Sequence, residues 1–140
     1  MIRKYKPEDI DNLIAIWQTA NAIAHPFLLE AFVERVENDM RALYLPNAET
    51  WILEVNGIAI GFVALIGNEV GGLFLNPAHH GQGFGRALID HAFRLKGPLK
   101  VEVFEKNKIG RRFYDGYGFI ETERHLHEAS SEIVLTMCKN

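Results

Sequence analysis

The chain has 140 residues, a hydrophobic content of 48% and a formal net charge of −3 from 15 basic and 18 acidic residues. A chain of this length buries roughly 68–70% of its unfolded surface, which predicts a single domain over residues 1–140. Because basic residues are neither in excess nor gathered in one segment, we expect no nucleic-acid partner.

Helices dominate the first third of the chain. Residues Ile2 to Lys4 predict a short strand, and Pro7-Glu8-Asp9 begins a helix that runs to about Asn21. A second helix is expected from about Leu28 to Leu45, where Pro46 ends it. Its apolar residues are spaced for burial on one face: Phe32, Val36, Met40 and Leu43.

A β-meander is expected next. The dipeptide Asn56-Gly57 is the strongest short signal for a hairpin, and it lies between the apolar segments Trp51 to Val55 and Ile58 to Ile66. These two segments therefore predict antiparallel strands. Residues Glu69 to Leu75 predict a third strand of the same sheet.

The second half of the chain predicts a βαβ unit and a closing pair of strands. A helix over Gln82 to Leu95 joins the preceding strand to a parallel strand over Leu99 to Val103. A further helix over Lys108 to Tyr117 and strands over about Phe119 to Arg124 and Glu132 to Met137 follow. We expect an α/β fold with a central twisted, mixed sheet of six to seven strands and flanking helices.

The sequence also predicts where the protein works. Cys138 is the only cysteine, so no intramolecular disulfide is possible, and the N-terminus from Met1 to Lys6 leads into polar residues and not into an apolar signal core. The longest apolar run, Ile58 to Ile66, is far shorter than the about 20 residues that a membrane-spanning helix needs. We expect a cytoplasmic protein without a membrane partner.

Three alternate glycines, at positions 81, 83 and 85, lie between an apolar strand and the start of an amphipathic helix. Glycines let the backbone turn sharply and approach a ligand, and the free N–H groups of a helix's first turn attract anions. The segment predicts a cradle for a phosphate or pyrophosphate. It does not fit a P-loop, because no Gly-Lys pair exists, and Arg86 stands where a dinucleotide fingerprint requires its third glycine.

The run from Leu73 to Leu88 resembles motif A of the GNAT superfamily of acyl-CoA-dependent N-acetyltransferases, in which a pattern Gln/Arg-x-x-Gly-x-Gly/Ala begins the central helix. Here His80-Gly81-Gln82-Gly83-Phe84-Gly85 stands in that place, with His80 for the usual Gln or Arg. The resemblance implies a GNAT-like fold and acetyl-CoA or coenzyme A as cosubstrate, its pyrophosphate held by backbone amides. The motif A residues implied in coenzyme binding are Leu73, Phe74, Leu75, His80, Gly81, Gln82, Gly83, Phe84, Gly85 and Arg86.

A second run, Val103 to Phe119, resembles motif B of the same superfamily. The resemblance implies that Tyr114 is the general acid at the coenzyme sulfur, within the coenzyme site, and that Asn107 hydrogen-bonds the pantetheine arm. From the residues alone, an amphipathic core tyrosine is the alternative for Tyr114, and Asn107 is equally a helix cap. The family also separates the strand ending at Leu75 from the next parallel strand, which frees backbone N–H groups for the thioester carbonyl.

The amine acceptor is implied less sharply. The segment from Ile16 to Leu28 is similar to small bacterial YjaB-type acetyltransferases, and the family places acceptor contacts in this loop and in the last hairpin. Since an alkylammonium is almost fully protonated at pH 7, a base or a chain of waters leading to one must take its proton, and a carboxylate or histidine facing the cleft could be that base. The candidate substrate-binding residues are His25, Phe27, Glu69, Glu102 and His127, each of which is otherwise an ordinary loop or strand residue.

Two functions fit these motifs. The first is an enzyme that transfers an acetyl group from acetyl-CoA to a primary amine of a small molecule or peptide, by direct attack in a ternary complex. The second is a sensor that binds acyl-CoA with little turnover, and the presence of Tyr114 and Asn107 favours the enzyme. His79-His80 and His125-x-His127 lack a third ligand at a typical spacing, so we expect no metal. A homodimer is common in the family.

Overall fold

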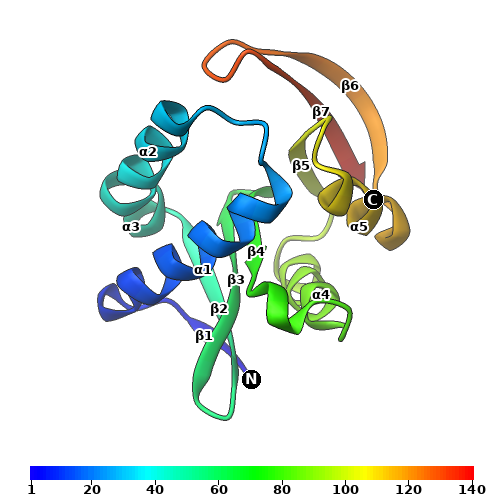
Figure 1. Cartoon of the computed structure of the whole chain (residues 1–140). Helices are drawn as coiled ribbons and strands as arrows, with labels where there is room; N and C mark the ends of the chain where they lie inside the picture. The colour runs from blue at the N-terminus through cyan, green and yellow to red at the C-terminus, as the bar shows by residue number, and fades with distance from the viewer.

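The computed structural model describes residues 1–140 and contains one seven-stranded sheet in the order β1-β2-β3-β4-β5-β7-β6 (Figure 1). All neighbouring strands are antiparallel except β4 and β5, which are parallel. The predicted mixed sheet with flanking helices is therefore confirmed. The strands are β1 (Ile2–Lys4), β2 (Glu49–Val55), β3 (Ile58–Ile66), β4 (Glu69–Leu75), β5 (Leu99–Phe104), β6 (Ile120–His127) and β7 (Glu132–Lys139).

Helices cover both faces of the sheet. Helices α1, α2 and α3 lie over one face, and α4 and α5 lie over the other (Figure 1). None of the helices is long and apolar enough to cross a bilayer. The helices are α1 (Ile10–Ala24), α2 (Glu30–Asp39), α3 (Leu45–Asn47), α4 (Phe84–Lys96) and α5 (Lys108–Tyr117), with 3₁₀ turns at Pro7–Asp9 and Pro77–His79.

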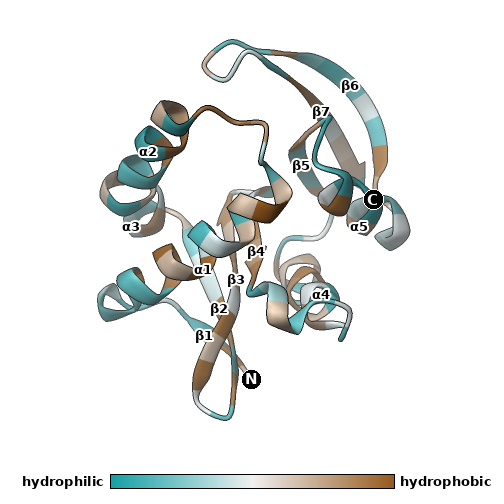
Figure 2. Cartoon of the chain, viewed as in Figure 1, coloured by the Kyte–Doolittle hydropathy of each residue, from teal (hydrophilic) through white to brown (hydrophobic).

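Alternation along the central strands divides the core into two clusters. Ile52 and Phe62 pack against α1, whereas their neighbours Leu53 and Val63 point to the opposite face and pack against α4. Such alternation is what period-2 strands buried on both faces require. Figure 2 shows the apolar segments concentrated in the central strands, while most of the edge strand β6 is hydrophilic.

The prediction for the second helix is wrong in its detail. Helix α2 begins at Glu30, a π-helical turn occupies Met40–Tyr44, and Pro46 lies inside α3 instead of ending the helix. The hydrogen bonds of a π turn span one more residue than those of an α-helix, so the turn rotates the residues that follow it. Met40 is buried as predicted and Leu45 is buried after the turn, while Leu43, expected in the core, is 54% exposed.

Other boundaries shift by a few residues. Helix α4 begins at Phe84 and not at Gln82, because Gly83 before it adopts a left-handed φ of +86°. Helix α1 continues to Ala24 instead of ending at Asn21, and β6 continues to His127. The shifts in α1 and β6 lengthen elements that end at the cleft described below.

The parallel strands β4 and β5 separate almost at once. They pair only at Glu69 with Lys100 and at Val70 with Val101. A register shift between β3 and β4 leaves Gly71 unpaired at this point, as the adjacent glycines suggested. The rest of β4 then has no partner on its β5 side, and a wedge-shaped opening separates the two halves of the sheet.

Candidate active site

Two cavities of comparable size occupy the opening between β4 and β5. The α4-side cavity, about 600 Å³, lies between the end of β4, the glycine loop before α4, and α5. The α2-side cavity, about 610 Å³, lies between α1, α2, β4 and β5. Both volumes are within the range of small-molecule sites.

The glycine loop borders the α4-side cavity. Gly81 and Gly83 have φ values of +78° and +86°, which residues with a Cβ rarely adopt, and a Cβ at either position would meet only open space. At Gly85 a Cβ would come within 3.2 Å of the Phe113 ring, so this glycine allows α4 and α5 to pack closely. The first N–H groups of α4 therefore face a clear space, as an anion cradle requires.

Basic side chains give the α4-side cavity its charge. Arg86 and Arg112 line it, and no aspartate or glutamate does. The Arg86 guanidinium lies 4.7 Å from the ring centre of Tyr117, whose hydroxyl donates a hydrogen bond of 2.6 Å to Asp90. Burial and this hydrogen bond raise the pKa of Tyr117 to about 12. The cavity therefore favours an anionic ligand.

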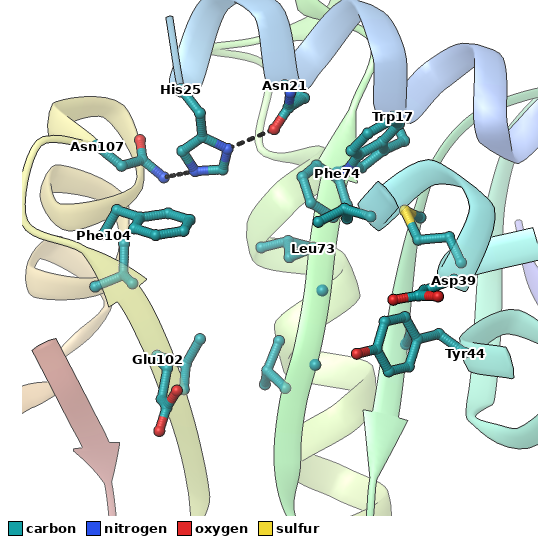
Figure 3. Close-up of a pocket in the computed structure, with 18 of the residues that line it drawn as sticks. Trp17, Asn21, His25, Asp39, Tyr44, Leu73, Phe74, Glu102, Phe104 and Asn107 are labelled. Atoms are coloured by element: carbon teal, nitrogen blue, oxygen red, sulfur yellow. Dashed lines mark hydrogen bonds between the residues drawn. The ribbon is translucent and has the colours of Figure 1, made fainter. Parts of the chain in front are cut away.

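The α2-side cavity carries the opposite charge. Asp39 and Glu102 line it from opposite walls, as Figure 3 shows. Neither carboxylate forms an ion pair. Glu69 also lines the cavity, but it pairs with Lys100 at 3.4 Å. Arg35 is the only lysine or arginine in the lining. The remaining wall is largely apolar and aromatic, which suits a cationic group on an apolar stem.

Five residues line both cavities and so mark their junction. Leu73 and Phe74 come from the part of β4 that β5 leaves unpaired. Asn107 precedes α5, Tyr114 lies within it, and His25 follows the end of α1. Any group that passes from a ligand in one cavity to a ligand in the other must cross at these residues.

Tyr114 is the buried phenol at the junction. Its side chain is 7% exposed, and its ring packs edge-on against Phe113 and Phe119 with centroids 5.2 Å apart in each case. Burial raises the pKa of Tyr114 far above its usual value. The hydroxyl is therefore protonated at any working pH and available as a hydrogen donor.

Asn107 and His25 form a polar contact across the junction. The Asn107 amide nitrogen lies 3.1 Å from His25 Nε2, and His25 Nδ1 lies 2.7 Å from the side-chain oxygen of Asn21 (Figure 3). Asn107 also caps α5, because its side-chain oxygen accepts a hydrogen bond of 2.9 Å from the Gly110 amide. Burial lowers the pKa of His25 to about 4, so the imidazole is neutral near pH 7.

Most predicted site residues lie at the two cavities. Every motif A residue named above lines the α4-side cavity except Gln82, whose side chain is exposed. Phe27 lines neither cavity, but its ring contacts those of His25 and Phe104. Glu105, another acidic residue near the cleft, pairs with Arg124 at 2.7 Å outside both cavities. The structure gathers no group of three or more His, Cys, Asp or Glu residues that fits a metal ion.

Sequence reasoning missed several residues of the cleft. Asn21 was expected at the end of a helix, and its place within α1 points it at His25. Asp39 at the end of α2 and Tyr44 at the end of the π turn both reach the α2-side cavity. Arg112 was visible beside the Phe-Tyr pair, yet charge alone could not place it. The missed lining residues include Trp17, Asn21, Asp39, Tyr44, Phe104 and Arg112.

Comparison with known proteins identifies this architecture. Residues 46–121 match the family model described as acetyltransferase (GNAT) domain. The chain is 34% identical to the peptidyl-lysine N-acetyltransferase YjaB of Salmonella typhimurium over 88% of this chain and 85% of that protein.

Solved structures agree with this match. The apo form of YjaB from Escherichia coli superposes with a TM-score of 0.89 at 29% identity, covering 99% of this chain and 95% of the other. The PaiA N-acetyltransferase of Thermoplasma acidophilum, solved in complex with coenzyme A, has a TM-score of 0.81 at 19% identity, covering 97% and 96%. The second likeness supports the fold alone.

The glycine loop generates a binding prediction. Gly83→Val should abolish the rise in melting temperature that coenzyme A produces, because a branched residue resists the left-handed φ and fills the space before α4. A ligand at 100 times its Kd adds about 2.7 kcal/mol to the wild-type protein, which thermal unfolding detects easily. His80→Ala, which keeps the backbone, should retain most of the shift. If Gly83→Val and His80→Ala lost the rise in melting temperature equally, the His80 side chain and not the backbone would bind the anion.

Burial of His25 generates a prediction for pH. Its pKa of about 4 lies below the unfolded value near 6.5, so the unfolded chain binds more protons between these values and stability falls as pH falls through this interval. Between pH 7.5 and pH 5 the free energy of unfolding should fall in both proteins. We expect this fall to be roughly 1 to 2 kcal/mol smaller in His25→Phe than in wild type. Denaturant unfolding at both pH values measures this difference. His91, whose pKa burial also lowers, contributes equally to both proteins. Parallel pH dependences would contradict the assignment.

Proposed function

The chain belongs to the GNAT family of acetyltransferases, and from this premise we propose that its two cavities hold the two substrates of acetyl transfer. The enzyme transfers an acetyl group from acetyl-CoA to a primary amine. We assign acetyl-CoA to the α4-side cavity and the amine to the α2-side cavity. The observation that carries this assignment is the junction at which Tyr114 borders both cavities.

The α4-side cavity suits the donor in charge and shape. The free N–H groups at the start of α4, together with Arg86 and Arg112, complement the phosphates of coenzyme A. The backbone edge of β4 that β5 leaves unpaired, from Gly71 to Leu75, offers hydrogen bonds to the peptide-like pantetheine arm. Asn107 at the junction offers a side-chain amide to the same arm.

The α2-side cavity suits an amine. Asp39 and Glu102 are carboxylates without a basic partner, so they attract an ammonium group. Glu102 lies two residues before Phe104, whose ring is 5.1 Å from that of His25 at the junction. We therefore assign Glu102 as the carboxylate that receives the ammonium proton, directly or through water, before attack. A domain that only sensed acyl-CoA would not need this second cavity.

The chemistry follows from these positions. The neutral amine nitrogen attacks the thioester carbonyl carbon, and backbone N–H groups of β4 stabilise the oxyanion that forms. When the intermediate collapses, the C–S bond breaks and its electron pair leaves on sulfur. As the C–S bond breaks, Tyr114 at the junction donates its hydroxyl proton to this thiolate. The attacking nitrogen loses its remaining extra proton to the Tyr114 phenolate, directly or through water, so that the products are a neutral amide and the coenzyme A thiol.

We propose a lysine side chain of a peptide as the acceptor. The Salmonella relative is named a peptidyl-lysine acetyltransferase, and a lysine presents one ammonium group on an apolar stem. The aromatic and aliphatic lining of the α2-side cavity matches that stem. Small-molecule amines are the alternative acceptors. A cytoplasmic location, a homodimer and the absence of metal, membrane and nucleic-acid partners stay predictions from the sequence.

Thiol release from acetyl-CoA tests the function. A peptide with one lysine and a blocked N-terminus should support continuous release of coenzyme A, whereas the same peptide with norleucine at that position should not. A diamine and an aminoglycoside tested in parallel separate peptide from small-molecule acceptors. Binding of coenzyme A without turnover of any of these amines would favour the acyl-CoA sensor over the enzyme.

Replacement of Tyr114 tests the acid. Tyr114→Phe keeps the ring and removes only the donor, and positioned general acids contribute about 10²- to 10⁴-fold. Since a thiolate is already a fair leaving group, we expect kcat to fall near the lower end of this range while the KM for acetyl-CoA changes little. Tyr5→Phe, which removes a phenol hydroxyl outside both cavities, is the matched control. A Tyr114→Phe turnover within about twofold of wild type would leave Tyr114 as a packing residue.

A further inference from the structure

The hydrogen bonds around Asn107 have only one consistent arrangement. The Gly110 amide is a donor, so the Asn107 side-chain oxygen must face it, and the Asn107 amide nitrogen must therefore face His25. His25 Nε2 then has to accept this hydrogen bond. Its Nδ1 consequently carries the imidazole proton and donates it to the Asn21 oxygen at 2.7 Å.

Packing keeps this arrangement in place. Asn107 and Asn21 are 8% and 6% exposed, and the His25 ring lies 5.1 Å from the ring centre of Phe104 and 5.8 Å from that of Phe27. A Cβ at Gly110 would come within 2.5 Å of the Asn107 amide nitrogen, so the side chain lies directly over this glycine. The amide has little freedom to turn in any other direction.

The contact also joins distant parts of the fold. His25 begins the loop between α1 and α2, and Asn107 stands between β5 and α5, so the hydrogen bond spans 82 positions of sequence. Figure 3 shows it bridging the cleft between the end of α1 and the β5 side. The loop that carries His25 borders the amine cavity, whereas Asn107 is assigned to the donor arm.

We propose that His25 is a positioning residue for the acyl donor: by accepting one hydrogen of the Asn107 amide, it directs the other hydrogen to the pantetheine arm of acetyl-CoA. This inference rests on the proposed placement of the donor in the α4-side cavity. With both ring nitrogens engaged, His25 does not act as the base for the amine. It preorganises the donor site from the acceptor side of the junction.

A comparison of two ligands tests this role without any acceptor. Coenzyme A carries the pantetheine arm, and 3′-phosphoadenosine 5′-diphosphate is the same nucleotide without it. Their Kd values are measured by calorimetry with wild type, His25→Phe and His25→Gln. His25→Phe keeps an aromatic ring against Phe104 but cannot accept a hydrogen bond, whereas the Gln side chain can present an oxygen to Asn107. A second variant, Asn21→Leu, removes the acceptor that fixes the imidazole proton on Nδ1.

We expect His25→Phe to raise the Kd for coenzyme A about 5- to 30-fold and the Kd for the nucleotide less than twofold, since one oriented hydrogen bond is lost. His25→Gln should recover coenzyme A binding to within about threefold of wild type, and Asn21→Leu should weaken it in the same selective way. Equal weakening of both ligands would reduce His25 to a structural role and overturn the inference. An unchanged Kd for coenzyme A in both His25→Phe and Asn21→Leu would overturn it as well. A wild-type protein that binds neither ligand would remove the proposed donor site itself.

Discussion

The separation of β4 from β5 is the constraint on which the site depends. Parallel strands usually stay paired along their length, yet here two residue pairs are followed by divergence and an unpaired Gly71. Each unpaired backbone group in the opening needs a partner, because a buried N–H or C=O without one is costly. The fold thereby creates a line of backbone donors and acceptors that a peptide-like ligand can satisfy. Both cavities exist because the sheet is open at this point.

Charge then distinguishes the two cavities. Arg86, Arg112 and a helix N-terminus face one side, and Asp39 and Glu102 face the other. The substrates of acetyl transfer differ in the same way, since coenzyme A is strongly anionic and an amine is cationic before it reacts. In the proposed assignment, opposite fields on the two sides of one junction steer each substrate to its own cavity. Between them, neutral groups predominate, and burial keeps His25 uncharged and Tyr114 protonated.

Predictions from the sequence were correct where a residue type is favoured for one specific backbone conformation. Asn56-Gly57 predicted its hairpin because both residues tolerate the positive φ that the turn requires, and their φ values are 54° and 77°. The glycines before α4 predicted a sharp backbone turn, and Gly81 and Gly83 adopt the left-handed φ values that such a turn uses. The prediction for the helix around Pro46 was wrong, because a π turn changes the phase without leaving a clear pattern in composition.

The sequence by itself determined the order of the elements, the mixed sheet and the glycine loop, because these depend on periodicity and on the backbone freedom of neighbouring residues. Only the tertiary structure decided which side chains meet. His25 and Asn107 are 82 positions apart, and nothing local in either segment indicates a hydrogen bond between them. Asp39 and Glu102 likewise share a cavity only after the sheet opens and α2 packs beside it. Contacts of this kind depend on packing between distant segments, which no pattern along the chain encodes.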